Sequence, residues 1–163
     1  MKYTAAIITL SDTRYAGLGK DLSKEVIEEI LNFFNFEVVS YTLLSDNFDK
    51  LTKELLLAAE KNINLIVTTG GTGLSTKDIT PEATKAVIER EVPGVMEAVR
   101  ANGMQYTQRA MLTRGICGIR QNSVIINLPG SPKACEENLR FVLPSLIHGI
   151  DSLLGNVSDC GRK

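Results

Sequence analysis

The stretch NLIVTTGGTG, residues 64–73, decides the fold expected for this chain. Asn64 to Thr68 is a short apolar run, typical of a strand that is buried on both faces of a sheet. Gly70-Gly71-Thr72-Gly73 then ends the strand, and its glycines allow the backbone to adopt positive φ and to approach a ligand closely. Successive amides in such a turn can bind an anion. The sequence therefore predicts a central strand followed by an anion-binding loop.

The segments on either side alternate between strand and helix patterns. Further strands are predicted at residues 5–10, 36–42, 116–120 and 123–128, and helices at 22–34, 51–59, from about Pro81, 93–101 and 131–154. This order indicates right-handed crossovers and a mostly parallel sheet, while the last two strands predict an antiparallel hairpin. We expect an α/β fold of three layers, a mostly parallel sheet flanked by helices with a short hairpin in the C-terminal half. Residues 1–163 are expected to form a single domain.

The composition excludes several classes of protein. With 18 basic and 19 acidic residues the net charge is −1, which argues against a nucleic-acid binder. The three cysteines, Cys117, Cys135 and Cys160, form no CxxC pair, and the single histidine, His148, gives a zinc site no second imidazole. His148 is interpreted as a surface or packing residue, with catalysis as the alternative. No signal peptide and no membrane-spanning run is found, so the cytoplasm is the expected location.

Two glycine loops follow strands at the sheet edge where open α/β proteins bind ligands. The first is 69–73, which leads to Thr80-Pro81, predicted as the N-cap and first residue of a helix. The second is 127–133, in which Ser131 can cap the last helix and Lys133 adds a cation near free amides. Each loop alone could be a glycine turn before a capped helix. Together they predict sites for two phosphorylated substrates or one long one.

Acidic residues lie at the same predicted edge. Asp46 follows the second strand and Asp78 the third, and carboxylates beside phosphates commonly hold Mg²⁺. Asp46 could instead cap the helix near Phe48, and Asp78 could form a turn. Ser11 and Asp12, after the first strand, are either pocket residues or turn formers. Neither GxxxxGK[ST] nor GxGxxG occurs, which argues against a P-loop hydrolase and a nicotinamide-dependent dehydrogenase.

Four stretches, in order along the chain, carry a resemblance to a known family. They are Thr69-Gly70-Gly71-Thr72-Gly73, the run DITPEAT at 78–84, Pro93-Gly94 with Glu97 and Arg100, and the run NLPGSPKA at 127–134. In these motifs the chain resembles the molybdopterin adenylyltransferases of molybdenum cofactor synthesis, a family that includes the G domains of plant cofactor-synthesis proteins and of gephyrin. The resemblance extends over nearly the whole domain.

The resemblance implies a homotrimer in which the terminal phosphate of molybdopterin attacks the α-phosphorus of Mg-ATP. AMP is transferred and pyrophosphate is released. Asp46 and Asp78 are then the catalytic acidic residues, and their carboxylates are the ligands of Mg²⁺. The resemblance implies substrate- and nucleotide-binding roles for Ser11, Asp12, Gly70, Gly71, Thr72, Gly73, Asn127, Pro129, Gly130, Ser131 and Lys133. Other cofactor-synthesis proteins are additional candidate partners, and neither nucleic acid nor a membrane is expected.

Two other functions remain open from the sequence. One is a molybdopterin-binding paralogue or scaffold without turnover, which tight pterin binding with no AMP transfer would reveal. The other is a different nucleotide-binding α/β enzyme, such as a pyrophosphatase related to competence-damage proteins, whose domain shares the GGTG loop. The combination of DITPEAT with NLPGSPKA favours the adenylyltransferase.

Overall fold

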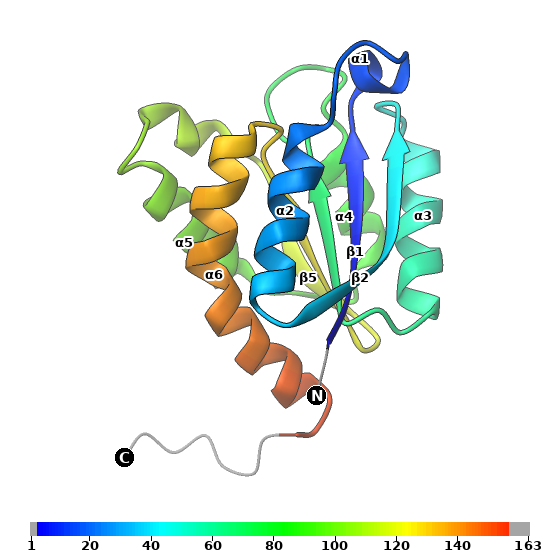
Figure 1. The fold of residues 1–163 in the computed structure, drawn as a ribbon, viewed down its shortest axis with the longest axis vertical. Coiled ribbons are helices and arrows are strands. Elements are labelled where there is room, and N and C mark those ends of the chain that lie inside the picture. The colour runs from blue at the N-terminus through cyan, green and yellow to red at the C-terminus, as the bar shows by residue number, and fades with distance from the viewer. Residues whose placement is uncertain (1–2, 157–163) are drawn as a thin grey trace.

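A computed structural model describes residues 3–156, which contain one six-stranded sheet (Figure 1). The strands lie in the order β2 (Phe36–Leu44), β1 (Tyr3–Leu10), β3 (Leu65–Thr69), β6 (Ser123–Leu128), β5 (Cys117–Arg120) and β4 (Arg90–Glu91). The first four are parallel, whereas β5 and β4 are each antiparallel to the preceding strand in that order. The predicted mostly parallel sheet with an antiparallel hairpin is confirmed.

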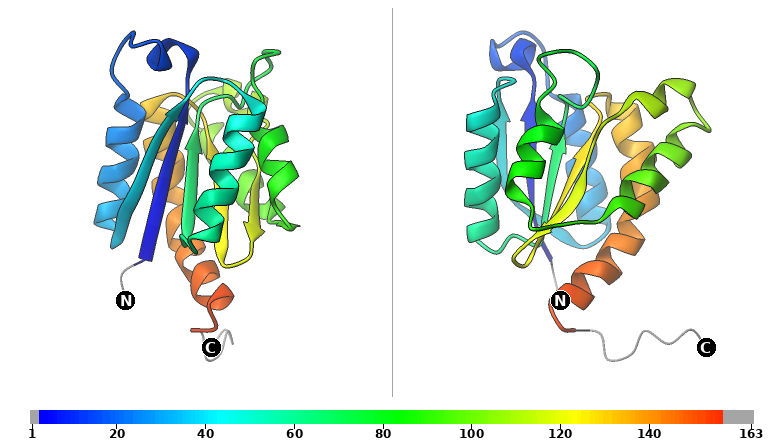
Figure 2. Two further views of the ribbon diagram at one scale, coloured as in Figure 1. Left: turned by 90° about the vertical axis from the view of Figure 1, so that its right-hand side faces the viewer. Right: turned by 180° about the vertical axis from the view of Figure 1, so that it is seen from behind.

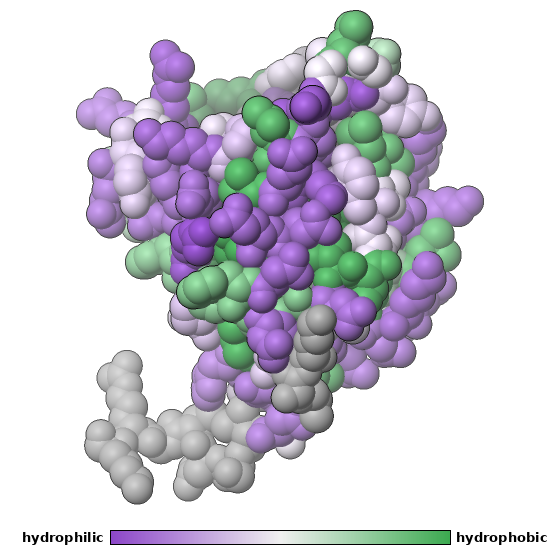
Figure 3. Space-filling model, in the orientation of Figure 1, coloured by the Kyte–Doolittle hydropathy of each residue, from purple (hydrophilic) through white to green (hydrophobic). Residues whose placement is uncertain are grey.

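Helices cover both faces of the sheet and complete three layers (Figure 2). One face packs against α2 (Leu22–Phe33), α5 (Pro93–Gly103) and α6 (Pro132–Leu153), and the other against α3 (Phe48–Glu60) and α4 (Thr80–Val87). The outer surface of the α2 and α6 layer is mainly hydrophilic, with hydrophobic residues in small groups (Figure 3). These helices are therefore amphipathic, as their sequence period predicts.

The central strands supply side chains to both cores. Val67 and Ile126 belong to the core beneath α2, α5 and α6, whereas Ile66 and Ile125 belong to the core beneath α3 and α4. All four side chains are buried, because successive residues of a strand point to opposite faces and both faces are covered. This explains why the strands read as continuous apolar runs in the sequence.

The sequence missed three short elements, α1 (Asp12–Tyr15), β4 and the 3-10 helix η1 (Gln108–Leu112). Each is five residues or shorter, too short to show a helical or strand period. Within residues 3–156, no helix combines the length and hydrophobicity required to cross a membrane. Cys117 and Cys135 are free and buried, and Cys160 lies outside the described residues.

The strand order creates the crevice that holds the candidate site. β1 pairs with β2 on one side and with β3 on the other, so the chain departs from β1 in two directions. Ligands in open α/β sheets bind at such a point, beyond the carboxyl ends of the strands. The loops after β1, β2, β3 and β6 meet there, at the end of the sheet marked by α1 in Figure 1.

Candidate functional site

A polar cavity of about 650 Å³ lies beyond the carboxyl ends of the parallel strands. Loops from four strands line it, and it brings together nine of the predicted site residues: Ser11, Asp12, Asp46, Gly70, Gly71, Thr72, Gly73, Asp78 and Gly130. The two predicted acids and both glycine loops therefore share one cavity, although they are up to 84 positions apart in the sequence (46 to 130).

The first glycine loop needs its glycines at specific positions. Gly70 and Gly71 have φ of +94° and +66°, a region that residues with side chains rarely occupy. A Cβ on Gly71 would collide with Thr80 Oγ1 and would lie 3.4 Å from Asp46 Oδ1. A Cβ on Gly73 would lie 2.9 Å from Asp78 Oδ2. The loop thus lies directly against both carboxylates.

Thr80 holds this loop in place instead of capping the next helix. The predicted cap is wrong, because Thr80 is already the first residue of α4 and its N-cap, Ile79, makes no side-chain cap bond. Thr80 Oγ1 donates to Gly70 O at 2.9 Å, and its backbone N–H donates to Gly71 O at 3.1 Å. Thr80 is completely buried, so these bonds are protected from water. The helix start and the loop are built as one unit.

Asp46 is not a helix cap, because Asn47 fills that role for α3 by accepting from the backbone N–H of Lys50 at 2.9 Å. Asp46 Oδ1 is instead buried without a hydrogen-bond partner. Burial raises the pKa of the Asp46 carboxyl, and the nearby charges of Asp12 and Asp78 raise it further. Such a carboxylate favours a cation beside it.

Asp12 connects two sides of the cavity. Its Oδ1 accepts from the backbone N–H of Asp46 at 3.0 Å, and its Oδ2 accepts from Lys77 Nζ at 3.2 Å. These two bonds, the first more than the second, lower the pKa of Asp12. Ser11, beside it, accepts from the backbone N–H of Arg14 at 3.2 Å and caps α1. Ser11 therefore forms the turn and also lines the cavity.

Asp78 has one oxygen engaged in a local turn. Its Oδ2 accepts from the backbone N–H of Ser75 at 3.0 Å, and its own N–H donates to Ser75 O at 3.0 Å. The predicted turn role is therefore real, and it orients the carboxylate relative to its own loop. No ion pair joins Asp46 or Asp78 to a cation among residues 3–156.

The donor set fits Mg²⁺ bound to a nucleotide better than a metal held by protein alone. Among residues 3–156, no group of three or more His, Cys, Asp or Glu side chains could hold a metal ion. Mg²⁺ retains water and usually binds one or two carboxylates together with substrate phosphates. The unpartnered buried oxygen of Asp46 and the nearby charge of Asp78 match that pattern.

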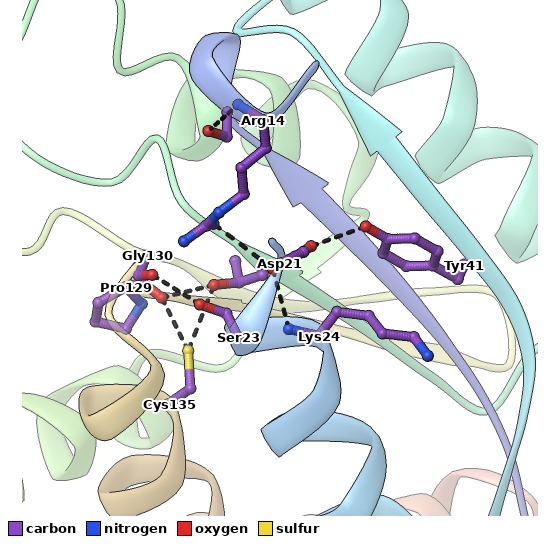
Figure 4. A network of polar contacts seen from close by, with 10 residues as sticks. Arg14, Asp21, Ser23, Lys24, Tyr41, Pro129, Gly130 and Cys135 are labelled. Atoms are coloured by element: carbon purple, nitrogen blue, oxygen red, sulfur yellow. Dashed lines mark hydrogen bonds and ion pairs between the residues drawn. The ribbon is translucent and has the colours of Figure 1, made fainter. Parts of the chain in front are cut away.

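The second glycine loop is fixed by side chains from other elements (Figure 4). Ser23 Oγ donates to Gly130 O at 2.8 Å, and Thr69 Oγ1 donates to Pro129 O at 2.7 Å. Cys135 Sγ also donates to Pro129 O, at 3.0 Å, and burial raises the pKa of this thiol to about 11, which keeps its proton available. The loop is therefore rigidly attached to α2, β3 and α6.

Four predicted residues of the second loop, Asn127, Pro129, Ser131 and Lys133, do not line the polar cavity. Asn127 is fully buried, donates to Thr68 and Thr84 at 2.9 Å each, and accepts from the backbone N–H of Ile116 at 3.0 Å. Ser131 caps α6, as predicted. The Lys133 side chain is 83% exposed and lies 4.0 Å from Glu137. Asn127 therefore supports the strand end from within.

Arg14 is a cavity residue that the sequence did not reveal. Its Nη1 lies 3.6 Å from Asp21 Oδ1, and Figure 4 shows Asp21 between it and Tyr41. Asp21 also caps α2 through the N–H of Lys24 at 3.1 Å and accepts from Tyr41 Oη at 2.8 Å. Burial, with the bond to Asp21, raises the pKa of Tyr41 to about 12. Arg14 was missed because it lies on α1, a helix too short to predict; Lys77 was missed as an isolated loop lysine.

A second, more apolar cavity of about 260 Å³ adjoins the first. Thr72 and Gly73 line both cavities. Val99, Leu112 and the predicted residue Pro129 are among the side chains that line the second one. No motif marked this cavity, because α5, η1 and α6 enclose it only after folding. A charged cavity next to an apolar one can accommodate a ligand with phosphate and ring parts.

Comparison with known proteins identifies the family. The family described as "Probable molybdopterin binding domain" matches residues 6–148. The chain belongs to this molybdopterin-binding family. A molybdopterin adenylyltransferase of Helicobacter pylori J99 is 38% identical over 96% of this chain and 91% of its own length. Gephyrin of Dictyostelium discoideum is 34% identical over 91% of this chain but only 22% of its own length.

Solved structures of the molybdopterin-binding family share the fold. The molybdopterin biosynthesis enzyme MoaB of Thermus thermophilus superposes with a TM-score of 0.88 and 42% identity, covering 94% of this chain and 97% of that one. The fold of this chain is therefore shared with a solved molybdopterin biosynthesis enzyme. The predicted resemblance, made from the motifs at 69–73, 78–84 and 127–134 and from Pro93-Gly94 with Glu97 and Arg100, is confirmed.

Proposed function

We propose that this protein is a molybdopterin adenylyltransferase, which transfers AMP from ATP to the terminal phosphate of molybdopterin in molybdenum cofactor biosynthesis. The observation that carries the proposal is the single polar cavity in which both glycine loops meet Asp46 and Asp78. The name of the Helicobacter pylori relative, aligned over nearly its whole length, supports the same reaction.

The proposed reaction joins two phosphates. An oxygen of the molybdopterin phosphate attacks the α-phosphorus of ATP and forms a new phosphorus–oxygen bond. The bond from the α-phosphorus to the oxygen of the β-phosphate breaks, and pyrophosphate leaves with the electron pair. The protein supplies position and charge, which dominate in this class of reaction, and no nucleophilic side chain is required.

Asp46 and Asp78 would hold Mg²⁺ against the triphosphate. When bound, Mg²⁺ neutralises phosphate charge and aligns the leaving group. The unpartnered Oδ1 of Asp46 and the lack of an ion pair at either acid in the described residues support this assignment. A bound cation would also offset the burial and the neighbouring acidic charges that raise the pKa of Asp46.

The remaining cavity residues would bind and orient the substrates. The backbone of Gly70–Gly73, which has glycine at three of its four positions, would approach the phosphates closely. Arg14 and Lys77, which also line the cavity, would provide positive charge. The apolar cavity behind Thr72 and Gly73 accommodates a ring of one substrate. Lys133, on the exposed start of α6, would guide anions toward the cavity without contacting them there.

A non-catalytic molybdopterin-binding role is the second candidate. Its support is the gephyrin relative, of which this chain matches only 22% of the length. Both acids are retained at the cavity, which favours turnover.

The proposal includes a homotrimer of single domains spanning 1–163, located in the cytoplasm where ATP is present. Other cofactor-synthesis proteins are proposed partners.

The test mixes purified protein with molybdopterin, ATP and magnesium and follows adenylylated pterin and pyrophosphate together. We expect equal amounts of both products, and none without magnesium. Asp78→Asn should lower transfer by at least about 100-fold while retaining the fold. Asp49→Asn, an acid in the exposed first turn of α3, is the matched control and should behave as wild type. Pterin binding without product would support the non-catalytic role, and pyrophosphate without pterin would mean a different acceptor.

A further inference from the structure

Arg114 fastens the loop that carries Asp78 at both of its ends. Its Nε donates to Gly73 O at 2.7 Å, and its Nη2 donates to Asp78 O at 2.8 Å. The backbone N–H of Arg114 donates to Thr72 O at 2.9 Å. One residue therefore bonds to the last positions of the glycine loop and to the acid that follows it.

Within residues 3–156, the segment between these two ends has one other tertiary bond, from the exposed Lys77 Nζ to Asp12 Oδ2 at 3.2 Å. Residues 74–77 are exposed and form neither helix nor strand. Within it, the Asp78 carboxylate closes a turn on the N–H of Ser75, but that bond is local and moves with the segment. Arg114 comes from the 113–116 connection that leads into β5, so it ties this exposed segment to the sheet.

Glu82 holds the guanidinium in place from the other side. Arg114 Nη1 forms an ion pair with Glu82 Oε1, from the first turn of α4. The guanidinium thus spans two carbonyls and one carboxylate with donors in a fixed plane. A lysine has a single ammonium on a flexible stem and cannot match three acceptors in that geometry.

We propose that Arg114 is a positioning residue, which sets the location of the Asp78 carboxylate in the polar cavity by holding Gly73 O and Asp78 O together. Arg114 does not line the polar cavity, so it acts through Asp78 and contacts no reacting atom. The role given to Asp78 rests on the proposed function, whereas the fastening of the segment does not.

The chain offers a matched control in Arg120. This arginine also donates to one backbone carbonyl, Val87 O at 2.9 Å, and lies 3.9 Å from a glutamate, Glu89. The two side chains have similar exposure, 27% for Arg120 and 35% for Arg114. Arg120 is at the opposite end of the sheet from the cavity, beside the β5–β6 turn.

The first measurement is hydrogen exchange of the free protein, which does not depend on turnover. In Arg114→Gln, the amides of residues 73–78 should exchange at least about tenfold faster, with the strands unchanged. Arg120→Gln should leave them as in wild type. Unchanged exchange in Arg114→Gln would overturn the proposal whatever reaction the protein performs.

The second measurement is steady-state adenylyl transfer. Arg114→Gln should lower kcat by about 100-fold, because small misplacement of a reacting group is costly, while KM for molybdopterin stays the same. The magnesium concentration for half-maximal rate should rise, and Arg114→Lys should recover part of kcat. A wild-type kcat in Arg114→Gln, or an equal loss in Arg120→Gln, would overturn the positioning role. Wild-type protein without any transfer would overturn the proposed function instead, and the exchange result would still decide whether Arg114 holds the segment.

Discussion

The loop after β3 and the loop after β6 begin alike, since each strand runs into glycine and then toward a helix with an early proline, but they are built differently. The β3 loop has two glycines with positive φ and continues through an exposed segment to Asp78. The β6 loop is short, leads directly to a helix capped by Ser131, and receives bonds from Ser23, Thr69 and Cys135.

This difference separates the proposed roles of the two loops. In the β3 loop, the backbone lies so close to the acids that a side chain at Gly71 or Gly73 would contact Asp46 or Asp78. The arrangement therefore requires glycine at these positions. In the β6 loop, the carbonyls of Pro129 and Gly130 are already bonded to protein, which makes the loop a rigid wall. In the proposed function, a shared sequence pattern thus gives one loop that sets the chemistry and one that supports it.

The largest expected difference concerns the glycines themselves. Gly71→Ala should lower the free energy of unfolding by about 2 kcal/mol, because φ is positive and the new Cβ meets Thr80. Gly130→Ala should stay within about 0.5 kcal/mol of wild type, since its Cβ would only touch Gly70 Cα at 3.5 Å. Urea unfolding measures both. Equal losses in the two variants would remove the distinction between the loops.

The next expected effect compares the two cations, one in the cavity and one at the start of α6. Arg14→Gln should raise KM for ATP by about tenfold, because the positive charge proposed to face the phosphates is lost from the cavity. Lys133→Gln should change it by less than about twofold, since Lys133 is exposed and its interactions are screened. Initial rates at varied ATP test this. A larger effect at Lys133 would mean that the β6 loop contacts the nucleotide directly.

The smallest expected effect is on the unfolding midpoint, and here removing the charge of Asp46 should stabilise the protein. Because burial and neighbouring acids raise the pKa of Asp46, its charged form is disfavoured in the folded protein, and stability is lost as the pH rises through that pKa. Asp46→Asn should therefore raise the unfolding midpoint of the ligand-free protein at pH 7 by about 2 °C. The difference from wild type should shrink as the pH falls below the ordinary aspartate range. Thermal unfolding scans at several pH values measure this difference. A lower unfolding midpoint for Asp46→Asn than for wild type at pH 7 would contradict the prediction.

The fold was predictable because its signals are local and repeated. Buried strands such as 64–68 and amphipathic helices such as 22–34 have clear periods, and capping by Ser131 followed from residue type. Thr80 misled the prediction, because its hydroxyl bonds the buried Gly70 carbonyl, a partner ten positions away that no local rule anticipates.

The site was predictable where it consists of motifs and not where it depends on tertiary contacts. The glycine loops and the acids Asp46 and Asp78 stand at strand ends, and topology alone brings them together. Arg14 and Arg114 belong to no sequence motif, because their positions depend on partners distant in the sequence. Arg14 pairs with Asp21, seven positions away, and Arg114 bonds to Gly73, 41 positions away (14 to 21; 73 to 114). The apolar cavity has no motif for the same reason.

The most direct test of the central claim is a double-mutant cycle on the two acids of the polar cavity. If Asp46 and Asp78 act together on one nucleotide, each change to asparagine should lower single-turnover AMP transfer by at least about 100-fold. The double variant should then lose little more than the slower single variant, because residues that act as a unit are not additive. Losses that multiply would mean that the acids act independently. Normal transfer in either single variant would contradict the account.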